Sequence, residues 1–316
     1  MRAPVGLVTS RLSMRHDAGP RALDRADRIE LVERELRSLG LAEELDLLEA
    51  EPIARELVDA VHVPAFVDWL AATSGRRPTS LEYDTHVGPD SFDVAGRASG
   101  GLWMAAERVL SGAWSSAFCL SRPPGHHAEA ARAMGFCLLN HVAIVARGLR
   151  TRHGLARIAI IDWDAHHGNG TQHLFEDDPS VFYASLHQWP LYPGTGGAGE
   201  RGFGDGLDTT LNVPLAVGTG NVEWLDAFER RVLPAVEAFR PDFVLISAGF
   251  DAHAEDPVSR TKLDESAFAR MTSGVLEVAA RLGHGRVVSL LEGGYDPGSL
   301  ARSTAAHVAA LLGKER

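Results

Sequence analysis

The sequence predicts an α/β fold in which helices cover both faces of a mostly parallel central sheet. Short apolar runs alternate with longer amphipathic stretches along the 316 residues, and strands that alternate with helices in this way form parallel sheets. Several runs are almost continuously hydrophobic, as in strands that are buried on both faces. Because no internal repeat or low-complexity linker interrupts the pattern, we expect a single domain over residues 1–316.

The predicted elements follow from the spacing of the apolar residues. Short apolar runs of strand length predict strands, namely Gly6–Thr9, Ala117–Leu120, Ile158–Asp162, Val181–Ser185, Thr209–Val213, Phe243–Ser247 and Val287–Leu291. Apolar residues repeated every three or four positions predict helices, namely Ala26–Leu39, Glu223–Phe239, Glu265–Leu282 and Leu300–Leu312. The most loop-like segments are 73–90, 188–207 and 249–262, and two of them directly follow strands, where binding loops belong.

Composition excludes several functional classes. The net charge is −11 and no block of consecutive basic residues occurs, so we expect no general affinity for nucleic acid. No run approaches the roughly 18 apolar residues of a membrane span, so we expect a soluble, cytoplasmic protein. Cys119 and Cys137 lack a CxxC spacing and are expected to be two buried thiols in a reducing compartment.

Polar side chains that suit a metal ion follow one predicted strand at alternate positions. Asp162, Asp164 and His166 point to the same side, because successive strand residues face opposite ways. Asp251 ends a second apolar run, and parallel strands present their carboxyl ends at one edge of the sheet. Asp164, His166 and Asp251 are therefore candidate ligands of an open Zn²⁺ site. A lone Asp-x-His also fits a helix cap beside a packed histidine, and the second acid-tipped strand favours the metal.

Two further elements carry groups for acid–base chemistry. The segment Arg122–Ala128 follows a strand, and its prolines and glycine fix a loop that holds His126 and His127. Imidazole can both accept and donate a proton near neutral pH, and different hydrogen-bond partners would push the two pKa values apart. Past the last strand, Tyr295 is placed to stabilise an oxyanion, although a turn with a half-buried tyrosine explains this motif by itself.

Taken in order, these motifs resemble those of the histone deacetylase family of metal-dependent amidohydrolases. The likeness is greatest to the class II and bacterial branch, which includes acetylpolyamine amidohydrolases and acetoin-utilisation proteins. It implies an arginase/deacetylase-like fold and the removal of acetyl groups from amines. It covers nearly the whole chain, through the helix Ala26–Leu39 and the segments 122–128, 135–137, 162–172, 185–188, 192–196, 247–251 and 292–295.

The resemblance implies a mechanism. Asp164, His166 and Asp251 would bind Zn²⁺, and Fe²⁺ is the other metal that such an oxygen-rich site accommodates. Water activated by the metal would attack the acyl carbonyl with His127 as the general base, while Tyr295 stabilises the oxyanion.

The resemblance also implies partners for the histidines. Asp162 would orient His126, which supports the developing charge. Asn169 stands where the partner of His127 lies in the family. Class I relatives have an aspartate there, so the neutral amide should leave His127 less basic.

The remaining implied positions line a tunnel and a second ion site. Phe136 and Tyr192 match the aromatic pair around the acyl-lysine stem, next to Gly135, Gly293 and Gly294. A structural potassium ion (K⁺) would be held by a set drawn from two neighbouring strands, namely Asp162, Ser185 and Leu186 with backbone oxygens of Asp164 and His166.

The substrate stays open between acetylated lysine in a peptide or protein and an acetylated polyamine or other small amine, because apolar walls around a four-carbon chain suit both. Some polyamine-preferring relatives carry an acid where this chain has Val258, which favours lysine. The usual His-Pro-Glu type motif is replaced in the segment His16–Asp24. The sequence also leaves a homo-oligomer open.

Two alternative functions would require different residues. An arginase-like ureohydrolase needs further bridging carboxylates, but Gly168 and His253 occupy those positions. A non-catalytic binding module on the same fold would tolerate the loss of a ligand or of Tyr295, whereas each expected catalytic residue is present.

Overall fold

A computed structural model describes residues 3–19 and 22–314. The ends of the predicted 1–316 domain, residues 1–2 and 315–316, lie outside the described residues, as do residues 20–21 within the segment His16–Asp24. Within the described ranges, no helix is long and apolar enough to cross a membrane.

The strands confirm the predicted sheet. Its members in the described chain are β1 (Val5–Thr9), β2 (Leu45–Glu49), β5 (Ser116–Leu120), β6 (Ile158–Asp162), β7 (Val181–Trp189), β8 (Thr210–Ala216), β9 (Phe243–Ala248) and β10 (Val287–Leu291). They pair in the order β2-β1-β5-β10-β9-β6-β7-β8, and each of these pairings is parallel. A separate antiparallel pair joins β3 (Thr79–Ser80) to β4 (His86–Val87).

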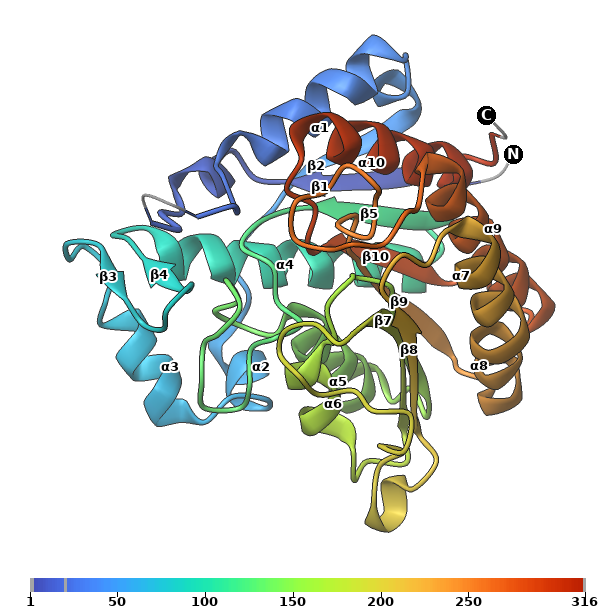
Figure 1. Cartoon of the computed structure of the whole chain (residues 1–316). Coiled ribbons are helices and arrows are strands. Elements are labelled where there is room, and N and C mark those ends of the chain that lie inside the picture. The colour runs from blue at the N-terminus through green and yellow to red at the C-terminus, as the bar shows by residue number, and fades with distance from the viewer. Residues whose placement is uncertain (1–2, 20–21, 315–316) are drawn as a thin grey trace.

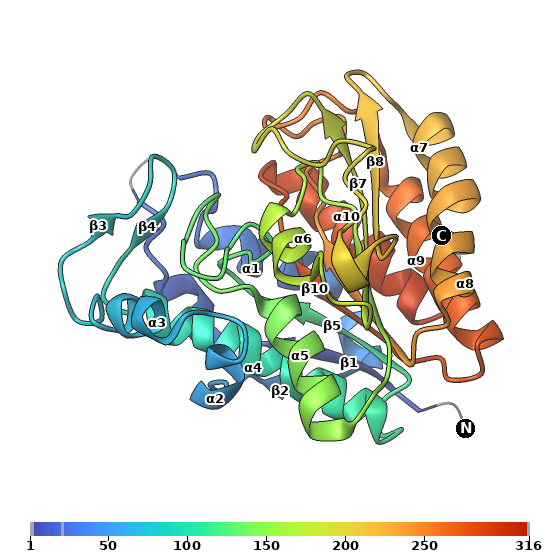
Figure 2. The ribbon, with the colours of Figure 1, turned by 90° about the horizontal axis from the view of Figure 1, so that it is seen from below.

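Helices cover both faces of this sheet, as expected (Figures 1 and 2). One layer contains α4 (Ser91–Leu110) and α5 (His141–His153), with α2 (Arg55–Asp59), α3 (Pro64–Ala71) and α6 (Asn169–Phe175) nearby. The opposite layer contains α1 (Asp27–Ser38), α7 (Asn221–Ala227), α8 (Leu233–Phe239), α9 (Glu265–Arg281) and α10 (Pro297–Leu311).

Strand β6 shows why the apolar runs are continuous. Ile158 and Ile160 belong to the core under α4 and α5, whereas Ala159 and Ile161 belong to the core under α9 and α10. Each of these side chains is fully buried. A strand between two helical layers needs apolar residues on both of its faces, and therefore at even and odd positions alike.

Several elements were not predicted, for identifiable reasons. Strand β2 lies at the edge of the sheet, where charged residues such as Asp46 and Glu49 remain exposed. The glycines in α4 weaken its helical signal, yet Gly100 is needed there, because a Cβ atom would lie 1.8 Å from the backbone oxygen of Glu51. The predicted helix Glu223–Phe239 is interrupted by a π-helical turn at Phe228–Val232.

The order of the strands decides which loops meet. β5, β10, β9 and β6 are neighbours in the sheet, so the segments that follow their carboxyl ends converge at one edge. These segments carry the histidine pair, Tyr295, Asp251 and Asp164. Open α/β sheets place their binding sites at such an edge.

Candidate active site

Asp164, His166 and Asp251 come together beyond the ends of β6 and β9. One ligand atom from each lies within 4.8 Å of the others. The Nδ1 atom of His166 is 3.0 Å from Oδ1 of Asp164 and 2.8 Å from Oδ2 of Asp251. Both carboxylates are almost fully buried.

This arrangement fits a divalent cation. Burial and the nearby Asp164 raise the pKa of Asp251 above its ordinary value, because two carboxylates that are buried together disfavour double ionisation. A cation between them would offset this repulsion. Two carboxylate oxygens and one imidazole nitrogen are a donor set that Zn²⁺ accepts, with positions left for water and substrate.

His126 is paired with Asp162. Its Nδ1 lies 3.0 Å from Oδ2 of Asp162, an oxygen that also accepts a hydrogen bond from the hydroxyl of Tyr183. Burial lowers the pKa of His126, but the charges of Asp162 and Asp164 outweigh burial and raise it to about 10.

His127 has a neutral partner instead. Its Nδ1 lies 2.8 Å from Oδ1 of Asn169. Burial, followed by the charges of His126 and His166, lowers the pKa of His127 well below its ordinary value. The adjacent histidines therefore have pKa values shifted in opposite directions, which suits one neutral base beside one charged group.

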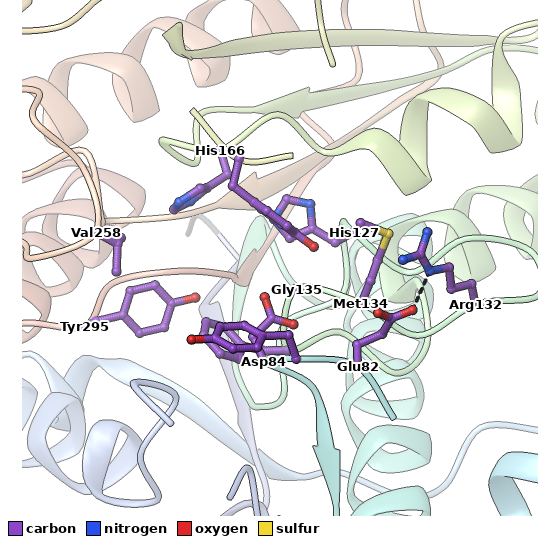
Figure 3. A pocket seen from close by; sticks show the side chains of 12 residues that line it. Glu82, Asp84, His127, Arg132, Met134, Gly135, His166, Val258 and Tyr295 are labelled. Carbon is purple, nitrogen blue, oxygen red and sulfur yellow. Dashed lines mark hydrogen bonds and ion pairs between the residues drawn. The ribbon is translucent and has the colours of Figure 1, made fainter. Parts of the chain in front are cut away.

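A pocket of about 390 Å³ opens above these groups (Figure 3). Phe136 and Tyr192, the residues expected to form a tunnel, line it together with His127, His166 and Tyr295. The ring centroids of His127 and Tyr192 are 5.1 Å apart, and those of Phe136 and Tyr295 are 5.6 Å apart.

The mouth of the pocket carries charge of both signs. Glu82 and Asp84 come from the segment around β3 and β4, and Arg132 lies 2.7 Å from Glu82. Figure 3 shows this ion pair on the side of the pocket opposite Tyr295 and Val258.

Tyr295 is held from two directions. Its backbone N–H donates a 2.6 Å hydrogen bond to Oδ2 of Asp256. The guanidinium of Arg28 lies 5.0 Å from the centre of its ring, and the same side chain donates to the backbone oxygens of Glu292 and Gly294. The hydroxyl of Tyr295 points into the pocket (Figure 3).

Close backbone approach explains two of the predicted tunnel glycines. A Cβ atom at Gly293 would lie 2.6 Å from Oδ2 of both Asp164 and Asp251. At Gly135, which has a φ of +56°, a Cβ atom would lie 2.4 Å from Cδ2 of His127. Gly294 also has a positive φ, of +125°, and its Cβ position faces Leu300 rather than the pocket.

The residues of the expected potassium site are neighbours in the sheet. Asp162 and Ser185 are direct partners in the parallel pairing of β6 with β7, and Leu186 follows. The hydroxyl of Ser185 lies 2.9 Å from Nδ1 of His187.

The segment His16–Asp24 packs beneath the histidine loop where it is described. Asp24 is buried and accepts hydrogen bonds from Arg28 and Arg122 through Oδ1, at 2.8 and 3.1 Å. The chain therefore uses this segment to anchor the loop that begins at Arg122. Cys119 and Cys137 are free and buried, as predicted.

Sequence reasoning missed several residues that contact the site, above all Glu129, Asp256 and the mouth residues Glu82, Asp84 and Arg132. Asp256 had a signal, because Asp-Pro pairs favour turns, and its Oδ1 accepts from the N–H of Val258. Glu129 had none beyond its closeness to His127 in the sequence.

Comparisons with known proteins identify the family to which the chain is similar. A family model described as "Histone deacetylase domain" matches residues 22–311. A "Probable deacetylase" of Archaeoglobus fulgidus is 38% identical over 311 residues, which cover 98% of this chain and 86% of that protein. The "Polyamine deacetylase HDAC10" of Homo sapiens is 39% identical over 304 residues, 92% of this chain and 45% of the human protein.

Solved structures extend the comparison to the fold. The HDA15 HD domain matches with a TM-score of 0.94 and 34% sequence identity, over 99% of this chain and 89% of that one. This match confirms the arginase/deacetylase-like α/β fold, and the family match extends over most of the sequence. The chain therefore belongs to the histone deacetylase family.

Proposed function

We propose that the chain is a zinc-dependent amidohydrolase that removes acetyl groups from lysine-like amines. The observation that carries this proposal is the convergence of Asp164 and Asp251 on His166, which lines one pocket together with His127 and Tyr295. A metal ligand set, a base and a hydroxyl donor around one cavity are what amide hydrolysis by water requires.

Zn²⁺ held by the three ligands would supply a Lewis acid that polarises the acyl carbonyl and lowers the pKa of water toward ~7. His127 would accept a proton from the attacking water at Nε2, because its Nδ1 is engaged with Asn169. The same histidine would then pass that proton to the leaving nitrogen. The products are acetate and a free amine.

The other two side chains would stabilise charge. Tyr295 would donate a hydrogen bond to the carbonyl oxygen as it becomes an oxyanion. His126, kept protonated by the charges of Asp162 and Asp164, would add a positive charge nearby.

We propose acetylated lysine in a peptide or protein as the preferred substrate. Phe136 and Tyr192 offer aromatic walls to a four-carbon stem. Val258 gives the mouth an apolar residue on the side of Tyr295, and Arg132 neutralises Glu82. A second cationic group of the substrate would thus meet Asp84 alone.

An acetylated polyamine is the second candidate. It is favoured by the carboxylate of Asp84 at the mouth and by the name of the human relative. Kinetics on an acetyl-lysine peptide, N-acetylputrescine and N-acetylspermidine decide between the two. A kcat/KM at least tenfold higher for the peptide supports lysine, and the reverse supports polyamines.

Val258 offers a sharper test of this choice. Val258→Glu adds a carboxylate at the mouth and should raise the ratio of kcat/KM for N-acetylspermidine over the peptide about tenfold. Val258→Gln, of similar size without the charge, is the matched control. Equal changes in both variants would show that shape rather than charge selects the substrate.

The hydrolytic mechanism and the metal have separate tests. Tyr295→Phe should lower kcat by about 10²–10³ on the best substrate, and unchanged turnover at saturation would refute the mechanism. Zn²⁺ added to chelator-treated protein should raise its melting temperature, since a ligand that binds only the folded state stabilises it. Asp251→Asn should remove most of that shift.

We also propose that potassium binds near Asp162, Ser185 and Leu186, which the pairing of β6 with β7 brings together. Replacing K⁺ with tetramethylammonium, which is too large for such a site, should lower the melting temperature. An unchanged melting temperature would count against the ion site and leave the zinc proposal intact.

A further inference from the structure

Asn169 links His127 to the carboxylate of Glu129 through hydrogen bonds. Oδ1 of Asn169 faces Nδ1 of His127 at 2.8 Å. Its Nδ2 donates to Oε1 of Glu129 at 2.5 Å. Two hydrogen bonds therefore connect His127 to Asn169 and Asn169 to Glu129.

The groups around the amide determine its orientation. Nδ2 faces acceptors only: Oε1 of Glu129, and at 3.5 Å the backbone oxygen of His127 and Sδ of Met134. If the amide rotated by half a turn, its carbonyl oxygen would face the Glu129 carboxylate and two acceptors would repel. The contacts at 3.5 Å are long and one involves sulfur, so Glu129 supplies most of the preference.

This orientation fixes the tautomer of His127. The Oδ1 atom of an amide can only accept a hydrogen bond, so Nδ1 of neutral His127 must carry the ring proton. The lone pair then lies on Nε2. A rotated Asn169 would offer its NH₂ group to Nδ1 and move the proton to Nε2, where it would block proton transfer from water.

We propose that Glu129 is a positioning residue that, through Asn169, holds His127 in the tautomer whose Nε2 can act as a base. The inference deepens the proposed function and rests on His127 as the general base. In the described structure Glu129 is not among the residues that line the pocket, and its Oε1 contacts Asn169 and His173.

The surroundings of Glu129 suit this task. Its backbone forms reciprocal hydrogen bonds with that of Arg132, which closes a tight turn. Oε1 also lies 2.9 Å from Nδ1 of His173, a partly exposed residue of α6. The Glu129 side chain is 21% exposed, whereas Asn169 is 2% exposed. The Glu129 side chain thus lies close to solvent, while the amide that donates to it is buried.

Two substitutions of Glu129 distinguish the effect of losing a hydrogen-bond acceptor from the effect of losing a negative charge. Glu129→Leu removes the acceptor, and we expect kcat to fall tenfold or more with KM changed less than twofold. Glu129→Gln can still present an oxygen to Asn169, and we expect kcat within threefold of the wild-type value. Glu176→Leu is the matched control. Glu176 is the C-cap residue of α6 and interacts electrostatically with Glu129 and His173. No hydrogen bond between its side chain and Asn169 is seen in the described residues. The kcat of this variant should be unchanged.

A spectroscopic measurement tests the tautomer without relying on activity. Long-range ¹H–¹⁵N spectra of zinc-loaded, ¹⁵N-histidine-labelled protein distinguish a protonated Nδ1 from a protonated Nε2, and His127→Ala identifies the signals. Wild-type and Glu129→Gln proteins should show the proton on Nδ1. Glu129→Leu should show a mixture or a proton on Nε2.

Each outcome decides the point. Glu129→Leu that keeps both kcat and the Nδ1 tautomer overturns the proposal. A loss of kcat in Glu129→Leu and Glu129→Gln alike, with the tautomer unchanged, also overturns it and assigns an electrostatic role. If the wild-type protein hydrolyses no acetylated amine, the proposed function fails, while the spectra still decide whether Glu129 sets the tautomer.

Discussion

Asp256 accepts a hydrogen bond from the backbone N–H of Tyr295 at 2.6 Å through Oδ2, and that same oxygen also accepts from the N–H of Asp296 at 3.2 Å. Asp256 lies in the loop after β9 and is 5% exposed, whereas Tyr295 follows β10. The contact ties the loop that carries Asp251 to the loop that carries the hydroxyl donor. Asp256 therefore sets where Tyr295 stands relative to the candidate metal ligands.

Asp256→Ala should lower kcat about 10- to 100-fold, because a misplaced donor loses much of its effect on an oxyanion. The effect should be non-additive with Tyr295→Phe, since both changes remove the same interaction. Steady-state kinetics of the two single variants and the double variant measure this coupling. Fully additive losses would show that Asp256 acts independently of Tyr295.

Gly293→Ala should weaken metal binding. Its Cβ would lie 2.6 Å from a carboxylate oxygen of both Asp164 and Asp251, and neither buried carboxylate can move without losing its place in the site. We expect at least a tenfold rise in the Zn²⁺ dissociation constant, measured by competition with a chromogenic chelator. Gly199→Ala, at a position with nothing within 4 Å of a Cβ atom, is the control and should bind Zn²⁺ normally.

Acid should destabilise the protein through His307. This side chain is fully buried between the hydroxyls of Thr272 and Ser289, and burial lowers its pKa to about 3. Between its unfolded pKa of about 6.5 and its folded pKa, only the unfolded state binds the proton. Stability conferred by the neutral ring is complete above pH 6.5 and is lost as the pH falls below it.

His307→Gln tests this assignment. Its free energy of unfolding should depend on pH less steeply than that of the wild type between pH 6.5 and 4.5, by up to one proton or roughly 1.4 kcal/mol per pH unit. Urea unfolding across this range supplies the slopes, and the difference at pH 8 reports the packing cost alone. Parallel slopes would mean that His307 does not contribute to acid sensitivity.

Two glycines of α4 should respond oppositely to alanine. Gly96 has nothing within 4 Å of a Cβ position, so Gly96→Ala should stabilise the protein by roughly 1 kcal/mol through helix propensity. Gly100→Ala should destabilise it by roughly 1–3 kcal/mol, because the methyl group meets the backbone oxygen of Glu51. Thermal unfolding compares the two, and a stabilised Gly100→Ala variant would contradict the packing seen here.

Strands and helices could be predicted where the local pattern of apolar residues indicates them. Each predicted strand is present, because burial between two helical layers requires runs such as residues 158–161 to be apolar at every position. Strand β2 escaped prediction, because an edge strand keeps charged residues such as Asp46 exposed. Helix α5, which begins at His141, was not predicted either. Its first two turns are buried on most sides, so the helix lacks the separate apolar and polar faces that indicate a helix in the sequence.

The sequence by itself determined which residues with catalytic or metal-binding side chains stand near strand ends. Asp162 is the last residue of β6, and Asp164, His166, Asp251 and Tyr295 lie a few residues beyond β6, β9 or β10. Tertiary structure decided which of these ends meet, since β10 and β9 come late in the chain yet lie between β5 and β6. It also decided the contacts of Asp256 with Tyr295 and of Glu129 with Asn169, across 39 and 40 residues. Periodicity reports the burial of each segment, but long-range pairing depends on the packing of whole layers, which leaves no local signature.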